Sequence, residues 1–192
     1  KTPADVDELM ALDCGDGTVA EMVNRAVAKI GEKITIRRFA RMEGQLVDTY
    51  IHLGGKIGVI VAAKTADAEK ARPAVHDVAM HIAAAKPGVL HRDEVDPADL
   101  DKEREILRAQ ALNEGKPEKI VDKMVEGRIE KYYKEVCLLE QPFVKDQDQN
   151  IRTMLKANGG LEIVRFYRFE MGEGLQKRQD NFAEEVMGQM NK

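Results

Sequence analysis

Two helical patterns separated by one tight turn, between Asp96 and Leu139, constrain the fold of this chain more than any other feature. Asp96 before Pro97 is a typical helix start, and Gly115 is a typical helix stop. Beyond Gly115, Pro117 fixes φ at a first helical position, and apolar residues then recur at helical spacing. These residues are Val121, Met124, Val125, Ile129, Tyr132, Val136 and Leu139. Helices joined by so short a turn lie antiparallel, so the sequence predicts a projecting helical hairpin.

Another helix is predicted over residues 19–30, near the start of the chain. Thr18 with Glu21 three residues later forms a capping box, which marks a helix N-terminus. Gly31 lies where a left-handed residue would end the helix. The apolar residues between these signals have helical spacing and are Val19, Met22, Val23, Ala26, Val27 and Ile30.

The residues after this helix change to the period of two that is typical of strands. We expect three strands, over residues 34–42, 47–53 and 56–63. Phe39 falls out of the alternation of the first strand, which predicts a β-bulge there. The third strand is apolar on both faces, so it should be the central and most buried strand of an antiparallel meander.

The remaining elements complete an α+β pattern. From Asp67 the spacing is helical again until Pro87 and Gly88, and this helix should cover the sheet. After the hairpin we expect a short helix over 151–157, a strand IVRFYRF that joins the sheet, and a closing C-terminal helix. The predicted fold is an antiparallel sheet of three to four strands covered by helices, with an inserted antiparallel coiled-coil hairpin and a C-terminal helix.

Charge and cysteine usage favour a protein partner inside the cytoplasm. Among 192 residues the net charge is −4, and basic and acidic residues are interspersed, which gives no electrostatic case for nucleic acid or an anionic membrane. No apolar run in the given sequence is long enough to span a membrane, and no charged start followed by an apolar segment marks a secretory signal in it. Cys14 and Cys137 lie far apart without a CxxC partner, which is typical of reduced thiols.

The residues that carry chemistry in enzymes form no catalytic pattern here. The chain has no serine, and neither cysteine has a histidine nearby in sequence. Four histidines, His52, His76, His81 and His91, lack metal-ligand spacing, and the glycine clusters lack the lysine of a phosphate loop. We therefore expect no enzyme activity, no metal and no cofactor. His52 falls on the strand face opposite Val47 and Ile51, so we expect it to be exposed at the sheet margin, where the simplest interpretation is a surface histidine without function.

Five blocks of the sequence, in this order and at compatible spacing, together resemble the translation elongation factor Ts family. They are VAKIGEKITIRRFARMEG, YIHLGGKIGVIVAAK, DVAMHIAAAKP, GKPEKIVDKMVEGRIEKYYKEVCLLEQPFVKD, and VRFYRFEMGEGLQK with FAEEV. The resemblance implies a domain organisation that we expect in this chain. It comprises a linker over 1–16, a core α+β subdomain of the dimerisation type over 17–90 and 142–174, the hairpin over 91–141, and a C-terminal helical module over 175–192.

The resemblance also implies a partner and the residues that bind it. Family members are cytoplasmic guanine nucleotide exchange factors for the GTPase elongation factor Tu. The IG loop and the histidine of YIH dock on that GTPase, and they correspond to Ile30, Gly31 and His52. The C-terminal helix adds contacts, which implies roles for Phe182, Ala183 and Val186.

The resemblance covers only the later part of the family's layout. The N-terminal helical domain and the first core subdomain, with its TDFVA-like segment at the partner's nucleotide site, have no counterpart here, and no TDF occurs in the chain. Because the chain also begins with Lys1, we expect part of a longer protein, which docks on elongation factor Tu with reduced exchange. The alternative is a structural interaction subunit bound to elongation factor Tu, as in RNA phage replicases. A homo-oligomer is possible, whereas a direct RNA-binding role has little support, because aromatics are few and Trp is absent.

Overall fold

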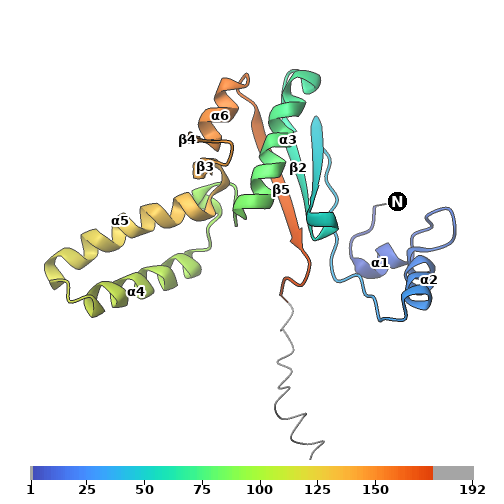
Figure 1. Cartoon of the computed structure of the whole chain (residues 1–192), viewed down its shortest axis with the longest axis horizontal. Coiled ribbons are helices and arrows are strands. Elements are labelled where there is room, and N and C mark those ends of the chain that lie inside the picture. The colour runs from blue at the N-terminus through green and yellow to red at the C-terminus, as the bar shows by residue number, and fades with distance from the viewer. Residues whose placement is uncertain (1, 175–192) are drawn as a thin grey trace, which may run out of the picture. The chain divides into compact units, whose positions relative to one another are not determined.

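The computed structural model describes residues 2–174, which form two units (Figure 1). One unit comprises residues up to Met42, and the other begins at Glu43. The two units are described separately. None of the helices within these described residues is long and apolar enough to cross a membrane.

The first unit contains two helices, α1 (Val6–Met10) and α2 (Val19–Ile30). The predicted capping box at the start of α2 is confirmed, because the Glu21 N–H donates to Thr18 Oγ1 at 3.2 Å and the Thr18 N–H donates to the Glu21 carboxylate at 2.8 Å. The helix ends at Gly31, whose φ is 80°, as predicted. No residue of α1 or α2 is buried.

The strand predicted over residues 34–42 is absent, so the prediction was wrong. Residues 33–43 adopt neither helix nor strand, and the bulge predicted at Phe39 has no ladder to interrupt. An alternating pattern makes a strand only where a neighbouring strand offers its backbone groups, and a local sequence pattern does not reveal such a neighbour.

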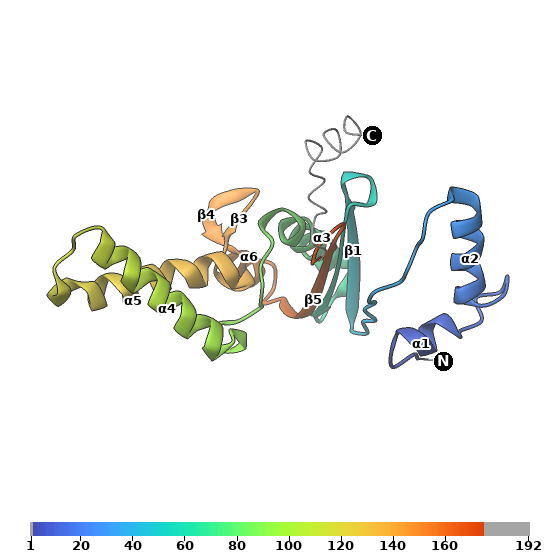
Figure 2. The same ribbon diagram turned by 90° about the horizontal axis from the view of Figure 1, so that it is seen from below.

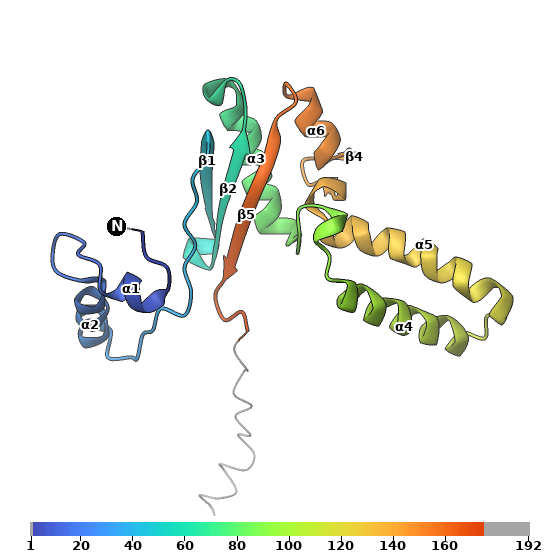
Figure 3. The ribbon, with the colours of Figure 1, turned by 180° about the vertical axis from the view of Figure 1, so that it is seen from behind.

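Three strands in the second unit make an antiparallel sheet in the order β1-β2-β5 (Figure 3). They are β1 (Leu46–His52), β2 (Ile57–Lys64) and β5 (Glu162–Glu170). The predictions that β2 is central and that residues 163–169 join the sheet are confirmed. At one end of the sheet His52 pairs with Ile57, which pairs with Glu170. The predicted meander is corrected, because β5 supplies the third strand from far along the chain.

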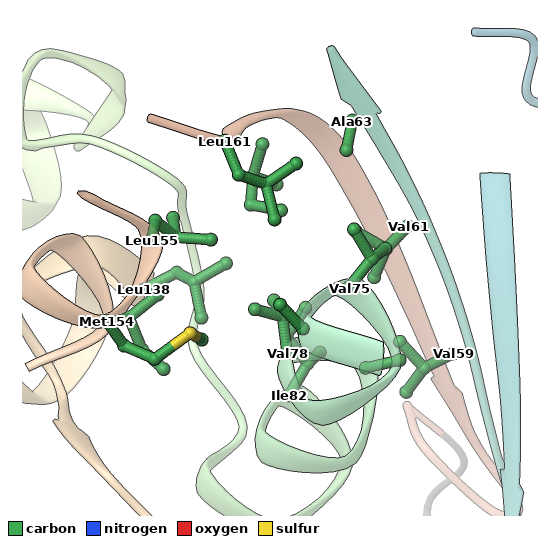
Figure 4. Close-up of a cluster of buried hydrophobic side chains, with 14 of the residues drawn as sticks. Val59, Val61, Ala63, Val75, Val78, Ile82, Leu138, Met154, Leu155 and Leu161 are labelled. Carbon is green, nitrogen blue, oxygen red and sulfur yellow. The ribbon is translucent and has the colours of Figure 1, made fainter. Parts of the chain in front are cut away.

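Helix α3 (Ala68–Ala85) covers one face of this sheet (Figure 3). Its fully buried residues Val75, Val78 and Ile82 point toward the strands, where Val59 and Val61 are buried (Figure 4). Burial of each such side chain stabilises the fold by about 1.5–3 kcal/mol. Helix α6 (Ile151–Ala157) and a 3-10 turn over Leu138–Glu140 extend the same core.

The hairpin consists of α4 (Pro97–Asn113) and α5 (Glu118–Val136), which lie side by side in two views, as predicted (Figures 1 and 2). Ala111, Val121, Val125 and Ile129 are buried between them. Pro117 is the residue before the helix and not its first residue, so the predicted start was one position early.

The hairpin joins the core through a buried polar pair, His81 of α3 and Gln141. His81 Nδ1 accepts a hydrogen bond from the Val144 N–H at 3.3 Å, so its Nε2–H donates to Gln141 Oε1 at 2.9 Å. The Gln141 amide donates to the carbonyls of Glu135 at 2.6 Å and Ala85 at 3.4 Å. Gln141 thus satisfies terminal carbonyls of both α5 and α3.

An ion cluster lies beside this pair. Arg92 donates to Glu140 at 2.6 Å and to Glu130 at 2.9 Å, and its guanidinium lies 4.5 Å from the centre of the Tyr133 ring. Hydrogen bonding to Arg92 lowers the pKa of Glu140. A two-stranded ribbon that the sequence did not reveal, β3 (Pro142–Phe143) and β4 (Asp146–Asn150), follows.

Candidate partner-docking site

The structure places the predicted site residues in different parts of the chain. Ile30 and Gly31 lie in the first unit and His52 in the second. Phe182, Ala183 and Val186 lie outside the described residues.

The end of α2 presents an apolar side chain to solvent. Ile30 is the last residue of the helix and is 60% exposed. Gly31 follows with φ 80°, a left-handed conformation that glycine adopts without steric cost. A Cβ added at Gly31 would meet no atom within 4 Å, so the backbone conformation and not crowding favours glycine here.

His52 lies at the end of β1, on the strand face that α3 covers. Leu46, Asp48, Tyr50 and His52 share this face, and Ile51 points the other way, as the alternation predicted. The expectation that His52 is exposed was wrong, because the side chain is half-buried. The residue that is exposed at this end of the strand is Ile51, at 65%.

A neighbouring tyrosine holds the His52 ring. Tyr50 Oη lies 3.0 Å from His52 Nδ1, and the two rings stack with centroids 5.6 Å apart and planes 29° apart. Residues two apart on a strand project from the same face, which explains why these two rings meet. These two contacts favour one orientation of the His52 ring.

The row continues from Tyr50 onto α3. The His76 ring meets Tyr50 edge-on at 5.7 Å, and His76 Nδ1 lies 2.7 Å from Asp48 Oδ2. Asp48, Tyr50, His76 and His52 thus form one continuous set of contacts across β1 and α3, which we call the histidine row. Asp48 and His76 also line a shallow cleft of about 550 Å³.

Exposed apolar side chains surround the His52 end of the sheet, and sequence reasoning did not single them out as a site. Ile51, Leu53 and Met171 are 65%, 62% and 70% exposed. The Met171 N–H donates to the Lys56 carbonyl at 2.8 Å, and the Lys56 N–H donates to the Leu53 carbonyl at 3.4 Å, which joins the ends of β1 and β5. We call Ile51, Leu53 and Met171 the apolar rim.

The backbone at Leu53 is strained. Its φ is 50°, in the left-handed region that a leucine rarely adopts. Gly54 and Gly55 follow with φ of 65° and 94°. Strain of this kind persists only where the surrounding structure imposes it, and it is frequent at binding sites.

The arrangement suits binding to the surface of a partner. The histidine row offers polar groups on a rigid support, and the apolar rim offers surface that a partner can remove from water. Burial raises the pKa of the Cys137 thiol to about 11, so this thiol stays protonated and is a poor nucleophile at neutral pH. Among residues 2–174, no group of three His, Cys, Asp or Glu side chains is arranged to hold a metal ion.

The family model described as elongation factor TS matches residues 1–173. The chain belongs to the elongation factor Ts family. Elongation factor Ts proteins are translation factors that exchange the guanine nucleotide of elongation factor Tu, an activity that makes and breaks no covalent bond. The matched range includes Ile30, Gly31 and His52 and ends before Phe182.

Proposed function

We propose that this chain binds elongation factor Tu through Ile30, Gly31 and His52 and promotes GDP release by preferring the nucleotide-free GTPase. The observation that carries the proposal is the end of the sheet at His52, where a fixed ring is surrounded by exposed apolar side chains. Phe182, Ala183 and Val186 are proposed as further contacts, and the cytoplasm as the site of action.

Exchange follows from binding alone. A protein that binds the nucleotide-free GTPase more tightly than the GDP complex weakens GDP binding by the same factor. A difference of about 4 kcal/mol corresponds to roughly a thousandfold change in GDP affinity. Contacts made equally to both forms of the GTPase raise the affinity of the complex but do not change the affinity for GDP.

We further propose that exchange by this chain is reduced. The 192 residues contain no Thr-Asp-Phe sequence, the segment that the family places against the magnesium and nucleotide site of its partner. The docking contacts alone then supply the preference for the nucleotide-free form.

The test compares affinities for nucleotide-free and GDP-bound elongation factor Tu, by calorimetry, for the wild type and His52→Ala. We expect the wild type to bind the nucleotide-free form more tightly, and His52→Ala to weaken that binding. His91→Ala is the matched control, because His91 is also half-buried but lies at the base of the hairpin. Equal loss in both variants, or no loss in His52→Ala, would remove His52 from the site.

The alternative function, a structural interaction subunit bound to elongation factor Tu, is favoured by the hairpin. Ile106, Leu112 and Ile120 on its two helices are 50%, 44% and 44% exposed. Apolar side chains on a projecting arm suit a further protein contact. Tight binding to elongation factor Tu without any acceleration of GDP release would favour this function.

A homo-oligomer is proposed from the sheet face opposite α3, part of which is exposed among the described residues of the second unit. Thr49 and Ile51 project from the face opposite α3 and are exposed. A second copy could cover that face, since packed sheets commonly bury apolar faces against each other. Light scattering of the purified chain tests this, with a monomer mass at high concentration as the contradicting result.

A further inference from the structure

Tyr50 occupies the centre of the histidine row, between His52 on one side and His76 on the other. Its hydroxyl lies 3.0 Å from His52 Nδ1, and its ring is 5.7 Å from that of His76. The inference drawn from this placement rests on the proposed docking role of His52.

Two contacts hold the Tyr50 ring in position, one with the hydrophobic core and one with His76. Its ring packs against the main hydrophobic core, and His76 meets that ring edge-on at 88°. His76 is in turn held by Asp48, whose carboxylate lies 2.7 Å from His76 Nδ1 and whose side chain is only 17% exposed. A ring packed in this way has one orientation, so its hydroxyl stays at the position of His52 Nδ1.

The hydrogen-bonding capacities of these groups indicate where the protons lie. The Asp48 carboxylate only accepts, so His76 Nδ1–H donates to it. A phenol O–H is a stronger donor than a neutral imidazole N–H, so we assign the Tyr50 O–H as the donor to His52 Nδ1. The neutral His52 ring then carries its proton on Nε2. Among the described residues the contact with Tyr50 is the single hydrogen bond of the His52 ring, which leaves Nε2–H available.

We propose that Tyr50 is a positioning residue that fixes the orientation and the Nε2–H tautomer of His52, so that Nε2–H donates a hydrogen bond to elongation factor Tu. His76 and Asp48 support it by holding the tyrosine ring. Without the hydroxyl, the His52 ring populates both tautomers and more orientations, and binding must then order it. Ordering one side chain on association weakens affinity by roughly 3- to 10-fold.

The test in the complex is Tyr50→Phe, which keeps the stacked ring and its core packing and removes only the hydroxyl. We expect 3- to 10-fold weaker binding to nucleotide-free elongation factor Tu when His52 is present, and no further loss in the His52→Ala background. Tyr132→Phe, at a half-buried tyrosine of α5, is the matched control and should bind like the wild type. An equal loss with and without His52, or no loss at all, would overturn the proposal.

The test in the free protein needs no partner. Long-range ¹⁵N–¹H NMR of the histidine side chains reports which ring nitrogen of His52 carries the proton. The wild type should show the Nε2–H tautomer alone, and Tyr50→Phe a mixture. An Nδ1–H tautomer in the wild type would overturn the proposal. If His52→Ala leaves the affinity for elongation factor Tu unchanged, both the docking role of His52 and its hydrogen bond to the partner are refuted. If His52→Ala weakens binding but Tyr50→Phe does not, only the positioning role of Tyr50 is refuted.

Discussion

Gln141 is the residue on which the junction between hairpin and core depends, and Gln141→Ala tests that dependence. The side chain is 4% exposed and makes three hydrogen bonds, one with His81 and two to the carbonyls of Glu135 and Ala85. The substitution leaves the His81 Nε2–H without its acceptor and two helix-terminal carbonyls without this donor. One buried polar group left unsatisfied costs about 1–3 kcal/mol, and the vacated volume adds to this. We expect a loss of about 2–4 kcal/mol in the free energy of unfolding.

Urea unfolding at pH 8, followed by far-UV circular dichroism, measures this loss. Gln147→Ala is the control, because Gln147 is exposed on the β3–β4 ribbon, and it should change the free energy by no more than about 0.5 kcal/mol. A loss below about 1 kcal/mol in Gln141→Ala would refute the reasoning, since water would then satisfy the groups that we describe as buried.

The same junction gives a pH dependence of known sign. Burial lowers the pKa of His81, and the hydrogen bond with Gln141 partly opposes this. The folded protein therefore binds fewer protons at His81 than the unfolded chain does. Above the ordinary histidine pKa of about 6.5 this difference does not affect the free energy of unfolding, and below that pH the free energy of unfolding declines. In Gln141→Ala the opposing hydrogen bond is gone, so the difference in the free energy of unfolding between wild type and variant should be larger at pH 5.5 than at pH 8. A constant gap would contradict this assignment.

Three further predictions concern separate parts of the chain. Arg92→Ala should lower the free energy of unfolding by about 0.5–1.5 kcal/mol, because its partly exposed ion pairs with Glu130 and Glu140 and its contact with Tyr133 are each weak, and 1 M salt should shrink the difference measured by urea unfolding. Gly31→Ala should lower the free energy of unfolding of α2 by about 1 kcal/mol, because Gly31 has a φ of 80° that alanine adopts only at a steric cost. An unchanged melting temperature in calorimetry would contradict this. Cys137 should react with iodoacetamide far more slowly than the exposed Cys14 at pH 8, as measured by mass spectrometry, and equal labelling of both thiols would refute this. The free energy of unfolding, measured with urea, should also fall as the pH rises from about 9 toward 11, because the Cys137 thiol ionises at a lower pH in the unfolded chain than in the folded protein.

Helices were predictable from the sequence because their signals are local. Thr18 and Glu21 cap α2 within one turn, and Gly31 ends it within another. The apolar spacing around Val121 and Ile129 likewise predicted a hairpin seam that is buried in the structure. Each of these interactions joins residues at most a few positions apart, or two helices joined by a short turn.

The errors arose where the outcome depends on distant partners. The pattern over residues 34–42 alternates correctly but has no neighbouring strand, while β5 reaches the sheet about a hundred residues after β2. The contacts of His52 depend on the ring of Tyr50, which His76 of α3 meets, and the proximity of Met171 to Lys56 depends on the register of β5. Sequence periodicity assigns a residue to a face, but it does not say which face a helix will cover.

The candidate site was therefore only partly predictable. The resemblance to elongation factor Ts singled out Ile30, Gly31 and His52, whose docking roles stay a prediction. Leu53 carried a usable signal, because a leucine directly before two glycines at the end of a strand falls in a tight turn. Met171 carried no local signal of this kind.

The release rate of fluorescent GDP from elongation factor Tu, with this chain titrated over a wide range, measures the proposed exchange activity itself. We predict that release accelerates, that the acceleration saturates with concentration, and that it requires higher concentrations of His52→Ala than of His91→Ala. A release rate that does not change at any concentration of the wild-type chain would contradict a preference for the nucleotide-free form.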